Sequence, residues 1–250
     1  MRLHLLFILV PAAAALALSP QSRVSLRETN VTGSFDVLVD GAVWFPAGAP
    51  TSVRQGGKDY SAADGSLKLV SQAEAPGVTG VDSLGAFKRM SWGWSAGGLN
   101  FTTSARIYAS SVVFEQEFTS AMAGTSMGDV DGILSSFPSL GLPANATDRD
   151  AARDAAPPAP ARGYLQYNGD MVGSGYHVGQ WDPTTGSVGS GIKGTAPLCI
   201  FGVQASAGSS AGMTSVVLSP LSNAMATSQY FKDGSLSYGV MGNVTDIPQG

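Results

Sequence analysis

Residues 34–45 read SFDVLVDGAVWF, and this stretch decides the fold class. Two runs rich in β-branched and aromatic residues flank Asp40 and Gly41. Asp-Gly between such runs predicts a type I′ β-hairpin, because that turn needs a positive φ at both central positions. We therefore expect two antiparallel strands joined at Asp40-Gly41.

Similar period-2 runs recur along the chain and are separated by glycine- and proline-rich turns. Residues 86–94 and 100–108 predict a second hairpin across Ala96-Gly97-Gly98, which residues 112–118 extend as a meander. Further runs lie at 66–72, 163–167, 198–203, 214–218 and 236–241. Outside the amino terminus, no run shows three turns of helical apolar spacing. The chain is therefore predicted to be all-β, a large antiparallel β-sandwich with few short helices.

The amino terminus has the pattern of a secretory signal peptide. Residues 1–4 form a short, positively charged segment and residues 5–18 are apolar. Residues 15–17 (Ala-Leu-Ala) fit a small-x-small cleavage site. A signal anchor is the alternative, but the apolar run is shorter than the roughly 20 residues that span a bilayer. We expect residues 1–19 to be removed and no membrane span to remain. The protein is then secreted or lies in the lumen of the secretory or lysosomal pathway.

Four Asn-X-Ser/Thr sequons agree with that compartment, at Asn30, Asn100, Asn145 and Asn243. Each is a candidate glycosylation site and hence a predicted surface position. The single cysteine, Cys199, excludes an intrachain disulfide and a cysteine-based zinc site. Because it lies in an apolar run, we expect it to act as a small buried hydrophobe.

The composition excludes several classes of protein. The 250 residues are 44% hydrophobic and 13% charged, which argues against a disordered chain. The net charge of −4 argues against a nucleic-acid binder. Residues 144–162 differ from the rest, being rich in Ala, Pro and Asp. We interpret them as a disordered loop within a single β-sandwich domain over residues 20–250, with a domain linker as the alternative.

Two acidic motifs are candidates for chemistry. Glu115 and Glu117 share one face of a predicted strand, and paired carboxylates can hydrolyse glycosides. The polar face of a half-buried strand explains the pair more simply. Residues 129–132 (Asp-Val-Asp-Gly) resemble part of a calcium loop, but a third oxygen ligand and the terminal Glu are missing. We therefore expect no catalytic pair, no metal and no cofactor.

Aromatic side chains suggest a carbohydrate contact. Trp92 and Trp94 lie on one face of a predicted strand, where packing in the core is expected. Trp181 lies between Gly179-Gln180 and Asp182-Pro183, so a loop over residues 175–183 is predicted to expose it. The alternative is that Trp181 folds back to cap the sandwich. The candidate carbohydrate contacts on this predicted loop are Trp181, Tyr176, His177, Asp182 and Gln180.

The carboxy-terminal third has a characteristic order of motifs. Residues 197–201 (PLCIF), 216–226 (VVLSPLSNAMA), 236–244 (LSYGVMGNV) and 247–250 (IPQG) follow one another. This order resembles the amino-terminal β-sandwich region of secreted glycoside hydrolases related to the α-galactosidase and raffinose-synthase group. In those proteins the sandwich precedes a (β/α)8 barrel that holds the catalytic carboxylates.

The resemblance implies a non-catalytic amino-terminal sandwich module of a secreted carbohydrate-active enzyme. We expect the 250-residue chain to be a fragment that lacks the catalytic barrel and to have no catalytic activity alone. Carbohydrate and a downstream barrel are the partners that the resemblance implies. Two alternatives stay open, a stand-alone lectin-like carbohydrate-binding protein and a structural secreted sandwich without a ligand.

Overall fold

The computed structural model describes residues 2–11, 22–31, 33–129, 132–142, 162–170, 173–181, 192–204 and 212–249. In these ranges the regular structure is antiparallel β-sheet, and helix is limited to the 3₁₀ turn η2 (Ala224–Ala226). The predicted all-β sandwich is thus confirmed. No helix in the described part of the chain is long and apolar enough to cross a membrane.

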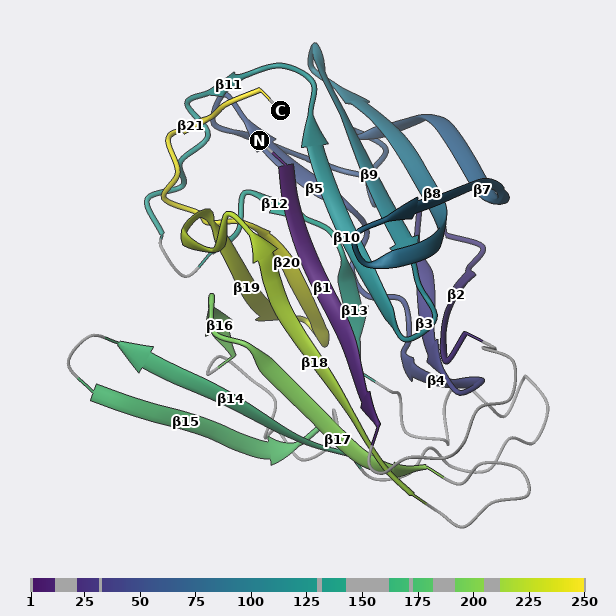
Figure 1. The fold of residues 1–250 in the computed structure, drawn as a ribbon. Helices are drawn as coiled ribbons and strands as arrows, with labels where there is room; N and C mark the ends of the chain where they lie inside the picture. Colours follow the sequence, from purple (N-terminus) through teal and green to yellow (C-terminus); the bar gives the residue numbers. More distant parts are fainter. Residues whose placement is uncertain are drawn as a thin grey trace.

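One layer is a twisted nine-stranded sheet (Figure 1). Its strands alternate between side chains that face the core and side chains that face outward, as the period-2 pattern predicts. In spatial order they are β15 (Gly173–Gln180), β14 (Arg162–Asp170), β17 (Leu198–Gln204), β18 (Gly212–Ser222), β1 (Arg2–Pro11), β10 (Ser111–Phe118), β9 (Leu99–Ile107), β8 (Gly85–Ala96) and β7 (Lys68–Asp82).

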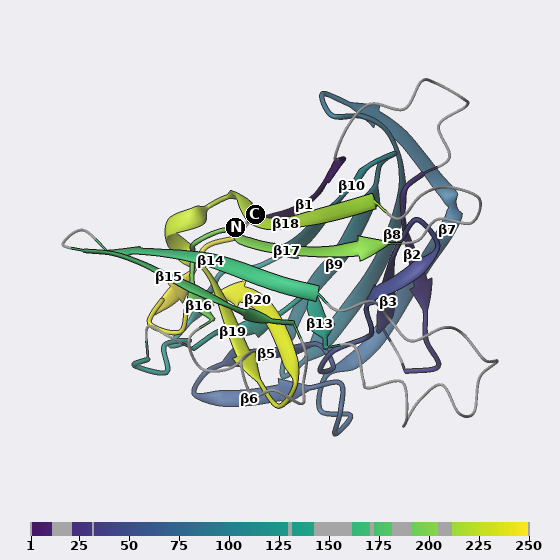
Figure 2. The same cartoon turned by 90° about the horizontal axis from the view of Figure 1, so that it is seen from below.

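Smaller sheets form the second layer and cover the concave face of the large sheet (Figure 2). The first contains β2 (Val24–Glu28), β3 (Phe35–Val39) and β4 (Ala42–Phe45). The second contains β12 (Ser135–Ser136), β5 (Ser52–Gln55) and β6 (Lys58–Ser61). The third contains β13 (Ser139–Gly141), β20 (Ser235–Val240), β19 (Thr227–Lys232) and β16 (Lys193–Gly194), and a separate pair joins β11 (Met122–Ala123) to β21 (Asp246–Ile247).

Both predicted hairpins are confirmed, with the turn chemistry that the sequence indicates. Asp40 and Gly41 have φ of 48° and 83° between β3 and β4. Gly97 and Gly98 have φ of 54° and 85° between β8 and β9. Positive φ at both central positions is what a type I′ turn requires.

Aromatic rings fill the space between the layers. Trp92 and Trp94 of β8 are both buried, which confirms the core prediction for this pair. Phe35 of β3 stacks on Trp92 with ring centroids 5.6 Å apart, and its centroid lies 5.5 Å from that of Phe114 of β10. The buried amide of Gln116 donates to the carbonyl of Phe137 at 2.7 Å, so a polar contact also joins β10 to the segment between β12 and β13.

The predicted leader supplies a strand of the large sheet. Residues 2–11 form β1, which lies between β10 and β18 and pairs with both. Its side chains alternate, and Leu3, Leu5 and Phe7 point into the core. The same apolar residues that predict a signal peptide therefore complete the sheet in this structure, and the removal of residues 1–19 stays a prediction.

Two predicted loops need correction. Residues 143–161 lie outside the described residues, but Arg162, predicted as the end of that loop, begins β14 and is buried. The loop predicted over residues 175–183 is wrong for its first part, because residues 173–180 form β15 and pair with β14. Glycines in this strand suggested a turn, but the ladder with β14 keeps it extended.

Candidate functional site

Strand β2 crosses the large sheet without joining its ladder, and this crossing creates a pocket. β2 pairs with β3 in the second layer. At its start, Ser22 Oγ donates to the carbonyl of Tyr108 at 3.0 Å, and Arg23 N donates to that of Ala109 at 2.7 Å. At its end, Gln72 of β7 donates to the Glu28 carboxylate at 2.9 Å. Between these attachments a cleft remains.

The cleft has a volume of about 1020 Å³ and a largely apolar wall. Met90 lies at the buried end, whereas Val81 and Ala86 lie at the exposed rim. Leu26 of β2 and Ile107 of β9 add further apolar surface. The full lining is Ser22, Val24, Ser25, Leu26, Glu28, Thr79, Gly80, Val81, Ala86, Phe87, Lys88, Met90, Ile107, Tyr108 and Ala109.

Two charged side chains line the pocket. Glu28 is half-buried and accepts the hydrogen bond from Gln72, so it has a partner. Lys88 is exposed at the rim, and among the described residues it takes part in no ion pair. The pocket therefore offers apolar surface together with one cation available to a ligand.

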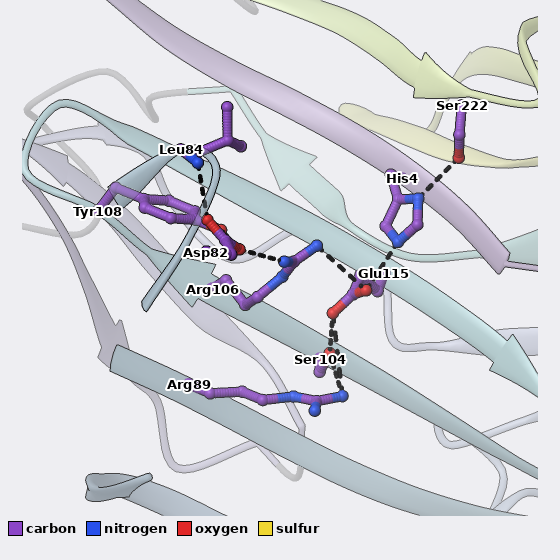
Figure 3. A network of polar contacts seen from close by, with 9 residues as sticks. All are labelled: His4, Asp82, Leu84, Arg89, Ser104, Arg106, Tyr108, Glu115 and Ser222. Carbon is purple, nitrogen blue, oxygen red and sulfur yellow. Dashed lines mark hydrogen bonds and ion pairs between the residues drawn. The ribbon is translucent and has the colours of Figure 1, made fainter. Parts of the chain in front are cut away.

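Tyr108 is held in place by a polar network on the outer face of the sheet (Figure 3). Its hydroxyl donates to Asp82 Oδ2 at 2.6 Å, and Arg106 Nη1 donates to the same oxygen at 2.6 Å. The bond from Tyr108 is the main reason that the pKa of Asp82 is lowered. Burial, and then the bond to Asp82, raises the pKa of Tyr108. Tyr108 therefore stays protonated and is fixed on the outer face of the sheet, where its ring packs against Phe87.

Glu115 on β10 is the centre of this network (Figure 3). It accepts from Ser104 at 3.0 Å and from Arg106 at 3.3 Å, and the Arg89 guanidinium lies 3.8 Å away. Burial acts to raise the pKa of Glu115. The hydrogen bond from His4, the charge of Arg106 and the bond from Ser104 outweigh burial and lower the pKa to about 2.

His4 joins three strands at the end of the network. Its Nε2 lies 2.7 Å from Glu115 Oε1, and its Nδ1 lies 2.7 Å from Ser222 Oγ. A neutral imidazole satisfies both contacts by donating Nε2–H to Glu115 and accepting the hydroxyl proton at Nδ1. The order of hydroxyl, imidazole and carboxylate is that of a serine-hydrolase triad. None of the three lines the pocket, and Glu115 is shared with Arg106, so we interpret the group as a structural link between β18, β1 and β10.

The structure buries the ring that was predicted to contact carbohydrate. Trp181 is 1% exposed and packs edge-on against Phe45 and Tyr164, with centroids 6.0 and 6.1 Å away. Its backbone N–H donates to the carbonyl of Arg162 at 2.7 Å, so it directly follows the β14–β15 ladder. The predicted exposure of Trp181 is therefore wrong, and the alternative, a ring that caps the sandwich, is correct.

The other predicted carbohydrate residues do not gather around Trp181. His177 and Gln180 are exposed on β15, and the backbone of Tyr176 pairs with that of Tyr167. Asp182 lies outside the described residues. Alternation along a strand sends neighbouring side chains to opposite faces, so residues adjacent in sequence do not make one contact surface.

Other predicted positions have mixed outcomes. Asn30, Asn100 and Asn243 are exposed, as a glycan requires, whereas Asn145 lies outside the described residues. Cys199 is half-buried on β17, less enclosed than predicted, and burial raises the pKa of its thiol. Glu115 and Glu117 share the outward face of β10, as predicted.

The pocket and the network were missed by sequence reasoning. A usable signal for the network was present, because Arg89, Arg106 and Glu115 occupy outward positions of three adjacent predicted strands. Cross-strand neighbours of opposite charge attract, which would have placed them together. The pocket left no comparable signal, since it depends on how β2 crosses the sheet.

In the ranges that the structure describes, no group of three His, Cys, Asp or Glu side chains could hold a metal ion. In comparisons with known proteins, no family model, curated protein or solved structure matches the chain.

Proposed function

We propose that this protein is a non-catalytic binding protein whose β2 pocket takes a small apolar molecule with one acidic group. The observation that carries the proposal is the cleft of about 1020 Å³ beneath β2. Ligand pockets typically measure about 300–1,000 Å³ and combine an apolar lining with a few polar groups. The β2 pocket fits this description, with largely aliphatic walls and few charges.

We expect an acidic group on the ligand because Lys88 places an ammonium group at the rim of the pocket. Lys88 and Ala86 lie on the same face of β8 as the buried Met90, because side chains two residues apart share a face. An apolar body resting near Met90 thus leaves its polar end near the ammonium at the rim. Glu28 disfavours a second acidic group at the β2 side, which limits the ligand to one.

The carbohydrate module predicted from the sequence is a second proposal. The all-β sandwich favours it, since such modules share that architecture. Burial of Trp181 removes the aromatic plane on which its sugar contact rested. Carbohydrate is therefore the competing ligand class in the test of the β2 pocket.

The test is a fluorescence titration with anilinonaphthalene sulfonate, an apolar probe with one acidic group. Ala86→Trp places an indole in the pocket, and Val70→Trp adds the same ring at an exposed position of β7 that does not line it. We expect saturable binding to the wild type and to Val70→Trp, and at least tenfold weaker binding to Ala86→Trp. Dodecanoate should displace the probe.

Two results would contradict the proposal. Equal binding by both tryptophan variants would place the probe elsewhere on the surface. Displacement by oligosaccharides but not by dodecanoate would favour the carbohydrate module. Near-ultraviolet circular dichroism of each variant confirms that the native packing is kept, since a loosened fold also binds the probe.

A further inference from the structure

Strand β1 occupies a slot that is bounded by backbone on both sides. Its residues 2–8 pair with β10 and its residues 4–11 pair with β18 (Figure 1). Both ladders are antiparallel, so β10 and β18 run parallel to each other with β1 between them (Figure 2). On their facing edges, β10 and β18 therefore pair with β1 and not with each other.

Without β1 the two neighbouring strands face a gap. Adjacent strands lie about 4.8 Å apart, so β10 and β18 are separated by roughly twice that distance. Their facing N–H and C=O groups then lose partners, and unpaired buried backbone groups are costly. Closing the gap directly requires β10 and β18 to form a new parallel ladder, which shifts every strand on one side of the sheet.

The slot also has a side-chain pattern. Leu3, Leu5 and Phe7 fill three inward positions at 3%, 3% and 0% exposure, and the Phe7 ring lies edge-on to Phe45 at 5.6 Å. Outward, His4 lies between Glu115 and Ser222. The slot thus selects an extended segment with large apolar residues at alternate positions and a hydrogen-bonding, basic residue opposite Glu115.

The residues that fill the slot also match the pattern of a secretory signal peptide. The positive start, the apolar run and the small-x-small site predict cleavage after β1 and before β2. Cleavage there leaves the slot without its own strand. Main-chain pairing at an open strand edge is a known mode of peptide binding, in which pockets for alternate side chains give specificity.

We propose that the place of β1 is a strand-binding slot, which takes an extended apolar segment of another protein once residues 1–19 are removed. The incoming segment lies antiparallel to both β10 and β18. The slot is separate from the β2 pocket, so the proposal does not depend on the proposed ligand.

The experiment starts from the full chain, so that the sheet folds with β1 in place. A protease site inserted between residues 11 and 22 is cut under native conditions, which turns β1 into a non-covalent strand. Labelled peptides of residues 2–11 are then added, with a lysine tail for solubility. One carries Leu5→Asp at an inward position, and its matched control carries Ile8→Asp at an outward position.

We expect the wild-type and Ile8→Asp peptides to enter the cleaved protein and the Leu5→Asp peptide to bind at least a hundredfold more weakly. A peptide of unrelated sequence should also enter if it keeps three large apolar inward residues and the basic residue opposite Glu115. Entry can be followed by fluorescence anisotropy, and amide exchange of β10 and β18 should slow when a peptide binds.

Three results would overturn the proposal. Failure of every peptide to enter, after the cut β1 has been released in mild urea and the urea removed, shows that the slot closes. Equal binding of the Leu5→Asp and Ile8→Asp peptides shows that binding does not use the inward positions. Entry of only the chain's own sequence shows that the slot does not accept a segment of another protein.

Discussion

The imidazole of His4 lies 2.7 Å from the carboxylate of Glu115, across 111 positions of sequence. This contact ties the first strand of the chain to the charged network on β8 to β10. It is an outward contact, made above a layer in which Leu3, Leu5 and Phe7 are already buried. Apolar burial therefore holds β1 in place, and the His4–Glu115 contact fixes its register.

Glu115→Gln should weaken the fold and flatten its dependence on acid pH. The folded pKa of Glu115 is about 2, below the ordinary 4.5, so the carboxylate stabilises the fold above pH 4.5. That contribution is lost as the pH falls from 4.5 through 2. We expect a loss of about 1–3 kcal/mol at pH 7, because the substitution removes the negative charge that faces Arg106 and Arg89.

Urea unfolding at pH 7 and pH 3 measures this effect. Glu117→Gln, two residues along the same face of β10, is the matched control and should keep the acid-dependent loss. A Glu115→Gln variant that loses as much stability between the two pH values as the wild type would show that Glu115 does not contribute it.

Trp181→Ala should destabilise the protein without affecting the pocket. The ring is buried against Phe45 and Tyr164, and truncation of a buried Trp costs about 3–5 kcal/mol. Thermal unfolding should show a fall of many degrees, while the remaining folded protein still binds the acidic probe. An unchanged melting temperature with lost retention on oligosaccharide resin would instead restore Trp181 as a carbohydrate contact.

Arg162→Lys should lower the stability of the fold, although it keeps the positive charge. The buried guanidinium donates to the carbonyls of Trp44 and Val43, both at 3.0 Å, and stacks 4.6 Å from the centre of the Trp44 ring. A lysine lacks the planar fork that makes both bonds. We expect a loss of about 1–3 kcal/mol in urea unfolding.

Arg54→Lys is the control for this substitution. Arg54 pairs with Asp59, whose side chain is 73% exposed, and such surface pairs contribute about 0–1 kcal/mol. Equal losses for the two lysine variants would argue against a special role for the buried fork.

Gly239→Ala should disrupt the second layer. A Cβ at this position of β20 would overlap the backbone carbonyl of Ser135, which cannot move without shifting β12. Overpacking of this kind costs about 1–3 kcal/mol. At Gly212 of β18 a Cβ meets nothing within 4 Å, so Gly212→Ala should leave the melting temperature near that of the wild type. Similar melting temperatures for the two variants would contradict the close approach of β20 and β12.

Local patterns predicted much of the fold. Asp40-Gly41 and Gly97-Gly98 set their hairpins because positive φ is a property of the turn itself. Alternation correctly placed Trp92 and Trp94 on a buried face. Trp181 was misjudged because its glycine and proline neighbours suggested a loop, whereas β14 pairing and the Phe45 ring, far away in sequence, bury it.

The candidate site was less accessible to prediction. Ser22, Glu28 and Tyr108 define the pocket through contacts with partners 44 to 86 residues away, and no local pattern records how β2 crosses the sheet. The apolar alternation of β1 was visible, but the same run also satisfies the pattern of a signal peptide. Composition alone does not separate a strand from a leader when both need the same residues.

The β2 pocket is tested most directly by NMR of methionine methyl groups, because the chain has eight methionines and Met90 lines the pocket. Dodecanoate should shift the Met90 signal in a saturable way, and Ala86→Trp should abolish that shift. Met213 and Met225, exposed at 57% and 90%, report non-specific binding and should not move. Shifts of Met213 and Met225 with an unmoved Met90 would contradict the proposed ligand site.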